Sequence, residues 1–137
     1  PLAYDDPAYF EELLHRFHQL QEIFHLKDLH PSVLLQVSLS ASLGYLSLGK
    51  KEKALTYLAQ YTNIATGNLF PLQLNGDDFF PALENWFDKL MIGNQPPRND
   101  KIIRQSIFES VAQHPLFETL SKDKEYQSIL KQLKSII

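Results

Sequence analysis

The stretch that decides the fold runs from Leu34 to Ala65 and reads LLQVSLSASLGYLSLGKKEKALTYLAQYTNIA. On either side of Leu48–Glu52 the apolar residues recur at steps of three and four, which places them on one face of an α-helix. Gly49 is expected to take the positive φ angle that ends the first helix. Glu52 suits the positively polarised start of the second. The stretch therefore predicts a helical hairpin.

Signals for helix starts and stops divide the rest of the chain in the same way. Asp6 can cap a helix that begins at Pro7, and Asn99 or Asp100 can cap another. Ser121 is expected to begin the last helix. We expect helices over roughly residues 6–26, 31–48, 51–66, 78–93, 99–113 and 121–136. No alternation typical of strands interrupts them, so the predicted fold class is all-α, with about six antiparallel helices.

The composition fits one globular domain over residues 1–137. Apolar residues make up 44% of the chain, enough to form a core. The chain has no cysteine, which excludes disulfides and thiolate chemistry and is typical of a cytoplasmic protein. The formal net charge of −3 argues against nucleic-acid binding by these residues themselves. No apolar run is long enough to span a membrane, and no cofactor is expected.

The hairpin resembles one tetratricopeptide repeat. Tyr45, Gly49 and Ala54 stand at the spacing of that family, in which a small residue allows close helix packing and a glycine forms the turn. The early tryptophan position of the family is Ser38 here, and the closing proline is absent. The resemblance implies tetratricopeptide-like hairpins that stack as a short α-solenoid.

A longer segment, from Leu48 to Leu90, is similar to part of certain bacterial regulators. These proteins have an Xre-type helix-turn-helix domain followed by tetratricopeptide-like helices. The similarity lies in Leu48–Leu58, Phe70-Pro71-Leu72, Gly76–Phe80 and Trp86-Phe87. It implies that this chain is the C-terminal part of a longer protein whose N-terminal domain reads DNA. The helical part of such regulators dimerises, or senses a peptide or a small-molecule effector.

The resemblance also implies where a ligand or partner would bind. In tetratricopeptide folds the first helix of each pair lines the concave face of the domain. That register places five residues of this chain on a groove, namely Gln36, Leu39, Leu43, Leu46 and Ser47. Since most of them are apolar, the row suits a hydrophobic peptide or a partner helix. Plain burial in the core is the alternative.

Acidic and histidine side chains gather on the first expected helix. Glu12-x-x-His15 and Glu22-x-x-His25 each match the ligand pair of di-iron bundles. The two pairs lie about 15 Å apart along a helix, too far to share one metal centre. A solvated face with acid–base pairs at helical spacing is the favoured interpretation. We therefore expect neither a metal site nor catalytic residues.

Three hypotheses about function follow. The leading one is a sensor and oligomerisation domain of a bacterial transcription regulator. It would be a homodimer that binds an effector and meets DNA only through a missing N-terminal domain. The second is a stand-alone tetratricopeptide-like adaptor that binds a partner protein. The third, and least favoured, is a metal-dependent helical-bundle enzyme that uses the Glu and His face. A fold class does not by itself decide between them.

Overall fold

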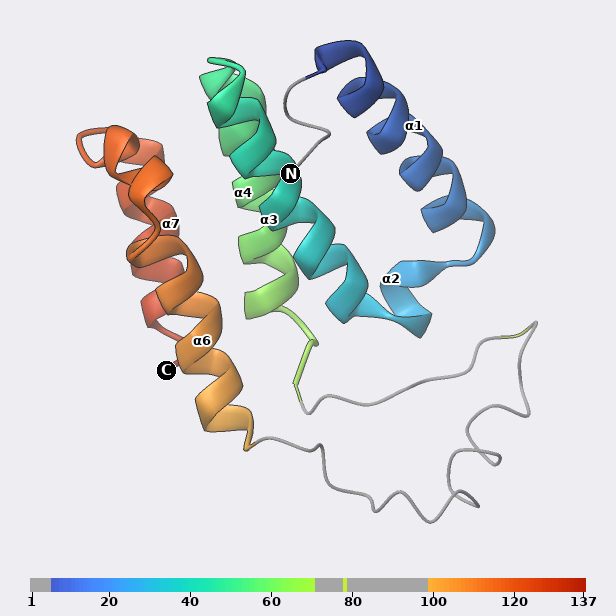
Figure 1. The fold of residues 1–137 in the computed structure, drawn as a ribbon. Helices are drawn as coiled ribbons and strands as arrows, with labels where there is room; N and C mark the ends of the chain where they lie inside the picture. The colour runs from blue at the N-terminus through green and yellow to red at the C-terminus, as the bar shows by residue number, and fades with distance from the viewer. Residues whose placement is uncertain (1–5, 71–77, 79–98) are drawn as a thin grey trace.

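The computed structural model describes residues 6–70, 78 and 99–137, and the regular structure in these residues is all helical (Figure 1). The elements are α1 (Pro7–Ile23), α2 (Leu26–Leu29), α3 (Pro31–Ser47), α4 (Lys51–Thr66), α6 (Asp100–Ala112), the 3-10 helix η2 (Pro115–Leu120) and α7 (Lys124–Lys134). The predicted all-α class is confirmed. Apart from Asp78 itself, the helix expected to start there lies outside the described ranges. No helix that the structure describes is long and apolar enough to cross a membrane.

Local capping chemistry fixes most helix ends where the sequence predicts them. Asp6 accepts hydrogen bonds from two backbone N–H groups of the first turn, both at 3.1 Å, and Pro7 begins α1. Asn99 caps α6 by accepting the N–H of Lys101 at 3.0 Å. Gly49 takes a φ of 72° between α3 and α4, which confirms the predicted hairpin turn.

Two predicted helix ends are wrong, each for a local reason. The first helix stops at Ile23 and not near Leu26, because His25 takes a left-handed conformation (φ 47°) and turns the chain into α2. The last helix begins after Asp123 and not at Ser121. The Asp123 carboxylate accepts two backbone N–H groups of the first turn of α7. The Ser121 N–H instead closes η2 by donating to a carbonyl of that helix.

The α3–α4 hairpin is the most closely packed pair among the described helices. Small residues make the close approach possible, since Ser38, Ala41, Ser42 and Gly44 are all buried on α3. The Ser42 hydroxyl donates to the carbonyl oxygen of Ala54 on α4 at 2.8 Å. This hydrogen bond satisfies a hydroxyl that would otherwise be buried without a partner.

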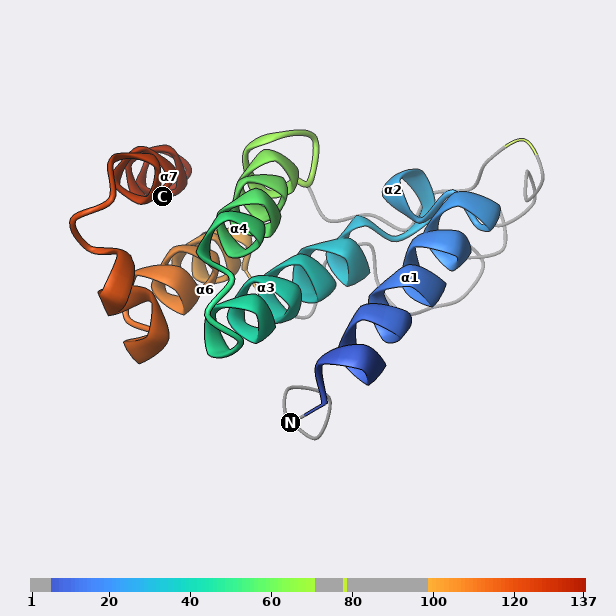
Figure 2. The same ribbon diagram turned by 90° about the horizontal axis from the view of Figure 1, so that it is seen from above.

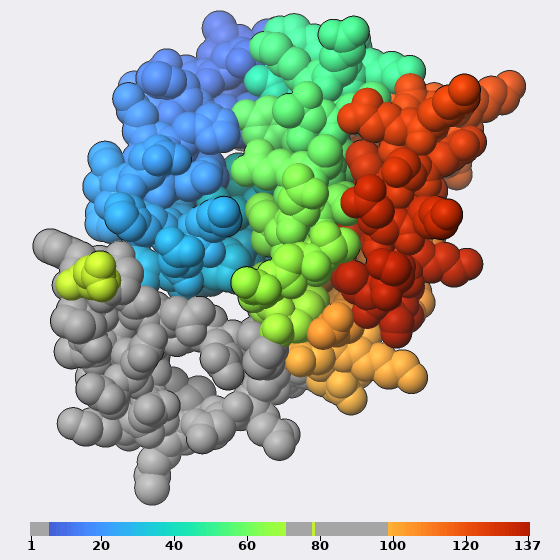
Figure 3. Space-filling view, turned by 180° about the vertical axis from the view of Figure 1, so that it is seen from behind, coloured from blue at the N-terminus to red at the C-terminus, as the bar shows by residue number. Residues whose placement is uncertain are grey.

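The helices lie in two layers when they are viewed nearly end-on (Figure 2). One layer holds α3 and α6, and the other holds α4 and α7. The helix α1 lies beside α3 at one edge of this arrangement. From behind, α4 (green) runs between the N-terminal helices (blue) and α7 (red) (Figure 3).

The buried apolar residues in the described ranges form two clusters. The larger one joins α3, α4, α6, η2 and α7, and Leu58, Val111, Phe117 and Leu133 are its most deeply buried members. The smaller one attaches α1 to the hairpin and consists of Phe10, Leu14, Ala41, Tyr45 and Ala54. The first helix is therefore held by its own contacts and not by the main core.

Candidate functional site

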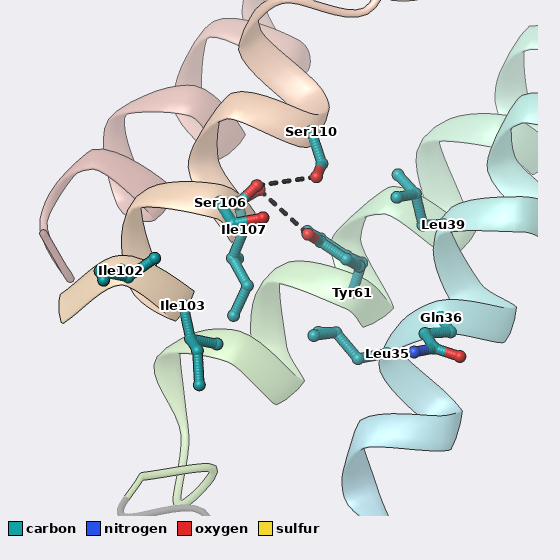
Figure 4. A pocket seen from close by; sticks show the side chains of 9 residues that line it. All are labelled: Leu35, Gln36, Leu39, Tyr61, Ile102, Ile103, Ser106, Ile107 and Ser110. Carbon is teal, nitrogen blue, oxygen red and sulfur yellow. Dashed lines mark hydrogen bonds between the residues drawn. The ribbon is translucent and has the colours of Figure 1, made fainter. Parts of the chain in front are cut away.

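A pocket of about 230 Å³ lies between α3, α4 and α6 (Figure 4). The residues that line it are Leu35, Gln36, Leu39, Tyr61, Ile102, Ile103, Ser106, Ile107 and Ser110. In Figure 4 the α3 and α6 residues face each other across the space, and Tyr61 of α4 lies between them. Mostly apolar walls with a few polar groups are typical of a site that binds a small ligand.

The polar groups of the pocket are uncharged. The Tyr61 hydroxyl donates to the carbonyl oxygen of Ile107 at 3.0 Å, and the Ser110 hydroxyl donates to the carbonyl oxygen of Ser106 at 2.7 Å. Burial raises the pKa of Tyr61, so its phenol stays neutral. No charged side chain occurs among the described residues that line the pocket. The site therefore suits an uncharged, largely apolar group.

The five residues predicted to line a groove divide into two sets. Gln36 and Leu39 line the pocket. Leu43 and Leu46 are partly buried and pack against the main core. Ser47 is exposed, and its hydroxyl donates to the carbonyl oxygen of Leu43 at 3.1 Å. The start of the predicted row thus borders a cavity, whereas its end belongs to the packing and the surface of the hairpin.

Sequence reasoning missed the other walls of the pocket. Tyr61 comes from α4, and Ile102, Ile103 and Ser106 come from α6. In the sequence the α6 residues look like one face of an ordinary amphipathic helix, because the same steps of three and four also describe core positions. Only the position of α6 across the pocket from α3 shows that they face a cavity.

A second arrangement of polar groups holds α1 against the hairpin. The Tyr45 hydroxyl donates to Glu11 Oε2 at 2.9 Å, and Lys50 and Lys53 contact Glu11 Oε1 at 3.3 and 3.2 Å. The hydrogen bond from Tyr45 and the two ammonium groups lower the pKa of Glu11. The Lys53 ammonium also lies 5.2 Å from the centre of the Tyr45 ring. Glu11 is therefore an ionised anchor on α1.

The same contact surface continues through two further aromatic rings. The Tyr57 ring stacks on Tyr45 with centroids 5.5 Å apart, and its hydroxyl lies 2.8 Å from His18 Nε2. Burial is the main cause that raises the pKa values of Tyr45 and Tyr57, so both phenols stay protonated. The four residues Glu11, His18, Tyr45 and Tyr57, together with Lys50 and Lys53, are called the α1 clasp below.

The acidic and histidine face of α1 is only partly solvated. Glu12 pairs with Arg16 at 2.8 Å, four residues along, as helical spacing predicts. His15, Glu22 and His25 are exposed. Glu11 and His18 lie on this face as well, but they contact Tyr45 and Tyr57 of the hairpin. Within the described ranges, no group of three or more His, Asp or Glu side chains is placed to hold a metal ion.

The two hydroxyl groups that line the pocket on α4 and at Ser110 are hydrogen-bonded to the main chain. The hydroxyls of Tyr61 and Ser110 donate to backbone carbonyls and not to a basic side chain. A serine–histidine contact does occur at the start of α3, where Ser32 Oγ lies 3.0 Å from His30 Nδ1. Both residues lie outside the pocket at a helix start, where such contacts order the first turn. An activated nucleophile also needs a base that a third group orients.

Comparison with known proteins identifies no relative. No protein-family model matches the sequence, and neither a curated protein nor a solved structure matches it.

Proposed function

We propose that this chain is the effector-binding domain of a bacterial transcription regulator, and that the pocket between α3 and α6 receives an apolar group of the effector. The observation that carries the proposal is the uncharged pocket at the junction of α3, α4 and α6. The regulator class comes from the resemblance of Leu48–Leu90 to the helical part of Xre-type proteins. The net charge of −3 agrees with DNA contact through another domain of the parent protein.

The size of the pocket limits what it can hold. Sites for drug-sized ligands usually enclose about 300–1,000 Å³, and this one encloses about 230 Å³. One or two apolar side chains of a peptide, or a small effector, would fill it. Gln36 is exposed where α3 borders the pocket, and its amide can hydrogen-bond to a peptide backbone.

The position of the pocket suggests how binding would be transmitted. Leu35 and Leu39 come from α3 of the hairpin, and Ile103 and Ile107 come from α6. A ligand that touches both walls stabilises one relative packing of these helices. We propose a tetratricopeptide-like stacking of the α3–α4 pair on the α6–α7 pair, through which this bias reaches an attached DNA-binding domain.

The test uses simple probes in place of an unknown effector. N-acetyl-leucine amide and N-acetyl-phenylalanine amide are titrated into the labelled protein, and chemical-shift changes are followed by NMR. We expect changes at Gln36, Leu39 and Ser106, with a Kd on the order of 1 mM for such small ligands. Ser106→Trp should fill the pocket and abolish the changes. Ser128→Trp, at an exposed position on α7, is the matched control. Changes scattered over the surface, or unaffected by Ser106→Trp, would contradict the proposal.

In the adaptor hypothesis a partner protein would bind the same pocket, but the chain would not be attached to a DNA-binding domain. Reading the coding sequence upstream of Pro1 separates the two. A helix-turn-helix segment there supports the regulator, and a start codon directly before Pro1 supports the adaptor. The metal-dependent enzyme predicts stoichiometric metal in the purified protein. A metal-free preparation that does not respond to iron or zinc would remove that hypothesis.

A further inference from the structure

The outer face of α1 exposes large apolar side chains. Tyr9, Leu13, Leu20, Ile23 and Phe24 leave 57%, 45%, 49%, 69% and 46% of their surface open. They do not belong to the face that packs on the hairpin, which carries Phe10 and Leu14. These five residues are called the α1 stripe. Apolar surface gathered on one helix face marks a site of interaction.

The spacing within the α1 stripe indicates what covers it. Tyr9, Leu13, Leu20 and Phe24 follow one another at steps of four, seven and four residues. At 3.6 residues per turn they lie within about 60° of one another around the helix. The pattern reads the same in both directions about a point between Arg16 and Phe17. A two-fold dimer needs such a self-complementary surface, because when one residue of the first copy meets a second residue of the other copy, the reverse contact forms as well.

We infer that the α1 stripe binds the α1 stripe of a second copy of this chain, with the two helices antiparallel. In that arrangement Tyr9 faces Phe24 of the second copy, and Leu13 faces Leu20 of the second copy. Because α1 lies at the edge of the two layers, its outer side has no neighbour among the described helices (Figure 2). Dimer formation through the α1 stripe does not depend on the pocket. A monomer that binds the probe ligands would contradict only the dimer, and a dimer that binds none would contradict only the proposed function.

Charge and area agree with this arrangement. Arg16 is the charged residue nearest the two-fold axis, and it forms an ion pair with Glu12 of the same copy at 2.8 Å. Neither copy therefore brings an unpaired charge to the centre of the interface. Large side chains expose on the order of 200 Å² when fully open, so five that are about half open supply about 500 Å² per copy. With its polar rim, a pair of copies then reaches the lower end of stable interfaces, about 1,200 Å² in total.

The experiment is sedimentation equilibrium of the full chain over about 1 µM to 1 mM, the range for an interface of this size. We expect the mass to rise from 15.8 kDa toward twice that value. Leu20→Glu should leave only monomer, because each substitution acts twice in the dimer. Leu116→Glu, at an exposed leucine outside the stripe, should not change the association. Circular dichroism checks that each variant is folded.

A charge swap tests the antiparallel pairing directly. The double variant Leu13→Lys with Leu20→Glu places each lysine opposite a glutamate of the other copy, so the dimer should return. Leu13→Glu with Leu20→Glu places like charges together and should stay monomeric. Since the chain has no cysteine, Arg16→Cys gives a single thiol near the axis. It should crosslink on oxidation, unlike Thr56→Cys on the exposed side of α4.

Three results would overturn the inference. The first is a mass of 15.8 kDa at every concentration. The second is a dimer that persists in Leu20→Glu or is not restored by the charge swap. The third is a monomer in which hydroxyl-radical footprinting finds Tyr9 and Phe24 protected, because another segment of the same chain would then cover the stripe.

Discussion

The two ends of the molecule are held by different kinds of contact. The helices α4, α6, η2 and α7 meet in an apolar core, where Leu58, Val111 and Phe117 are fully buried. The helix α1 meets the hairpin through a small apolar cluster and the α1 clasp, in which charged and aromatic groups alternate. One end of the chain is stabilised mainly by apolar burial, and the other depends more on hydrogen bonds to an ionised carboxylate.

The difference predicts two levels of stability within one domain. Removing α1 from the hairpin breaks the smaller cluster and the α1 clasp, but leaves the larger cluster intact. Local opening of this kind costs less free energy than global unfolding. The left-handed conformation of His25 after α1 is consistent with this, because a positive φ angle is uncommon for a non-glycine residue. We therefore expect α1 to detach before the remaining helices unfold.

The largest expected effect comes from deleting one phenylalanine ring at each end. Phe117→Ala opens a cavity at a residue with 0% exposure and should cost about 3–5 kcal/mol of the free energy of unfolding. Phe10→Ala, at 3% exposure, should cost less, because the rest of the domain stays folded when α1 detaches. Urea unfolding followed by circular dichroism gives both values. Equal losses in a single shared transition would show that α1 and the core are one cooperative unit.

Removing one hydroxyl at each end sharpens the comparison. Tyr61→Phe deletes a hydrogen bond to Ile107 and should cost about 1 kcal/mol of global stability. Tyr45→Phe deletes the bond to Glu11 at a similar cost, but the loss should appear only in α1. Amide hydrogen exchange separates the two variants. If Tyr45→Phe lowers protection in α7 as well, the α1 clasp is coupled to the core.

A third prediction uses pH to act on the α1 clasp. The folded chain lowers the pKa of Glu11 from its ordinary value of 4.5, so the stabilising contribution is present above that value. It is lost as the pH falls through the lowered pKa, because the folded state then takes up a proton that weakens the contacts with Tyr45 and both lysines. We expect α1 to lose hydrogen-exchange protection in acid before α4 does.

The control for the pH prediction lies at the other end of the chain. Glu11→Gln should remove the acid sensitivity of α1 and leave that of the core unchanged. Asp123 also has a lowered pKa, caused first by Lys51 and then by the N–H of Tyr126. Asp123→Asn should therefore affect the acid response of α7 but not that of α1. Acid loss of α1 protection that persists in Glu11→Gln would assign the effect to another group.

The sequence predicts the parts of the fold that depend on neighbours along the chain. Asp6, Gly49 and Asn99 act where they were expected, because a cap or a tight turn needs only the adjacent backbone. The left-handed His25 and the choice of Asp123 over Ser121 were not predictable in this way. Several residue types can fill either position, and packing selects among them.

The candidate site is less predictable, because it depends on how distant helices dock. Two residues of the row expected from the resemblance, Gln36 and Leu39, line the pocket, whereas Ser106 reaches the same cavity from α6. In the α1 clasp, spacing along α1 suggests a solvated face for His18. Only the hairpin brings the Tyr57 hydroxyl within 2.8 Å of it.

The smallest expected effect compares two ion pairs made by the same helix. Lys51 pairs with Asp123 at 2.6 Å at the core end, and Lys53 pairs with Glu11 at 3.2 Å in the α1 clasp. Both lysines are more than half exposed, so each pair should contribute little to stability. Lys53→Met should reduce protection in α1 alone, and Lys51→Met should reduce it at the start of α7.

Salt tests whether these two pairs act through their charges. Lys53 also lies over the Tyr45 ring, and Lys50 remains beside Glu11 when Lys53 is replaced. The α1 clasp can therefore keep part of its attraction in Lys53→Met. Among the described residues, Lys51→Met leaves the Asp123 carboxylate with its backbone partners alone. Added salt screens exposed charges, so it should reduce the difference between wild type and each variant. Differences in hydrogen exchange that persist at high salt would assign these lysines a packing role, through their aliphatic stems and not their charge.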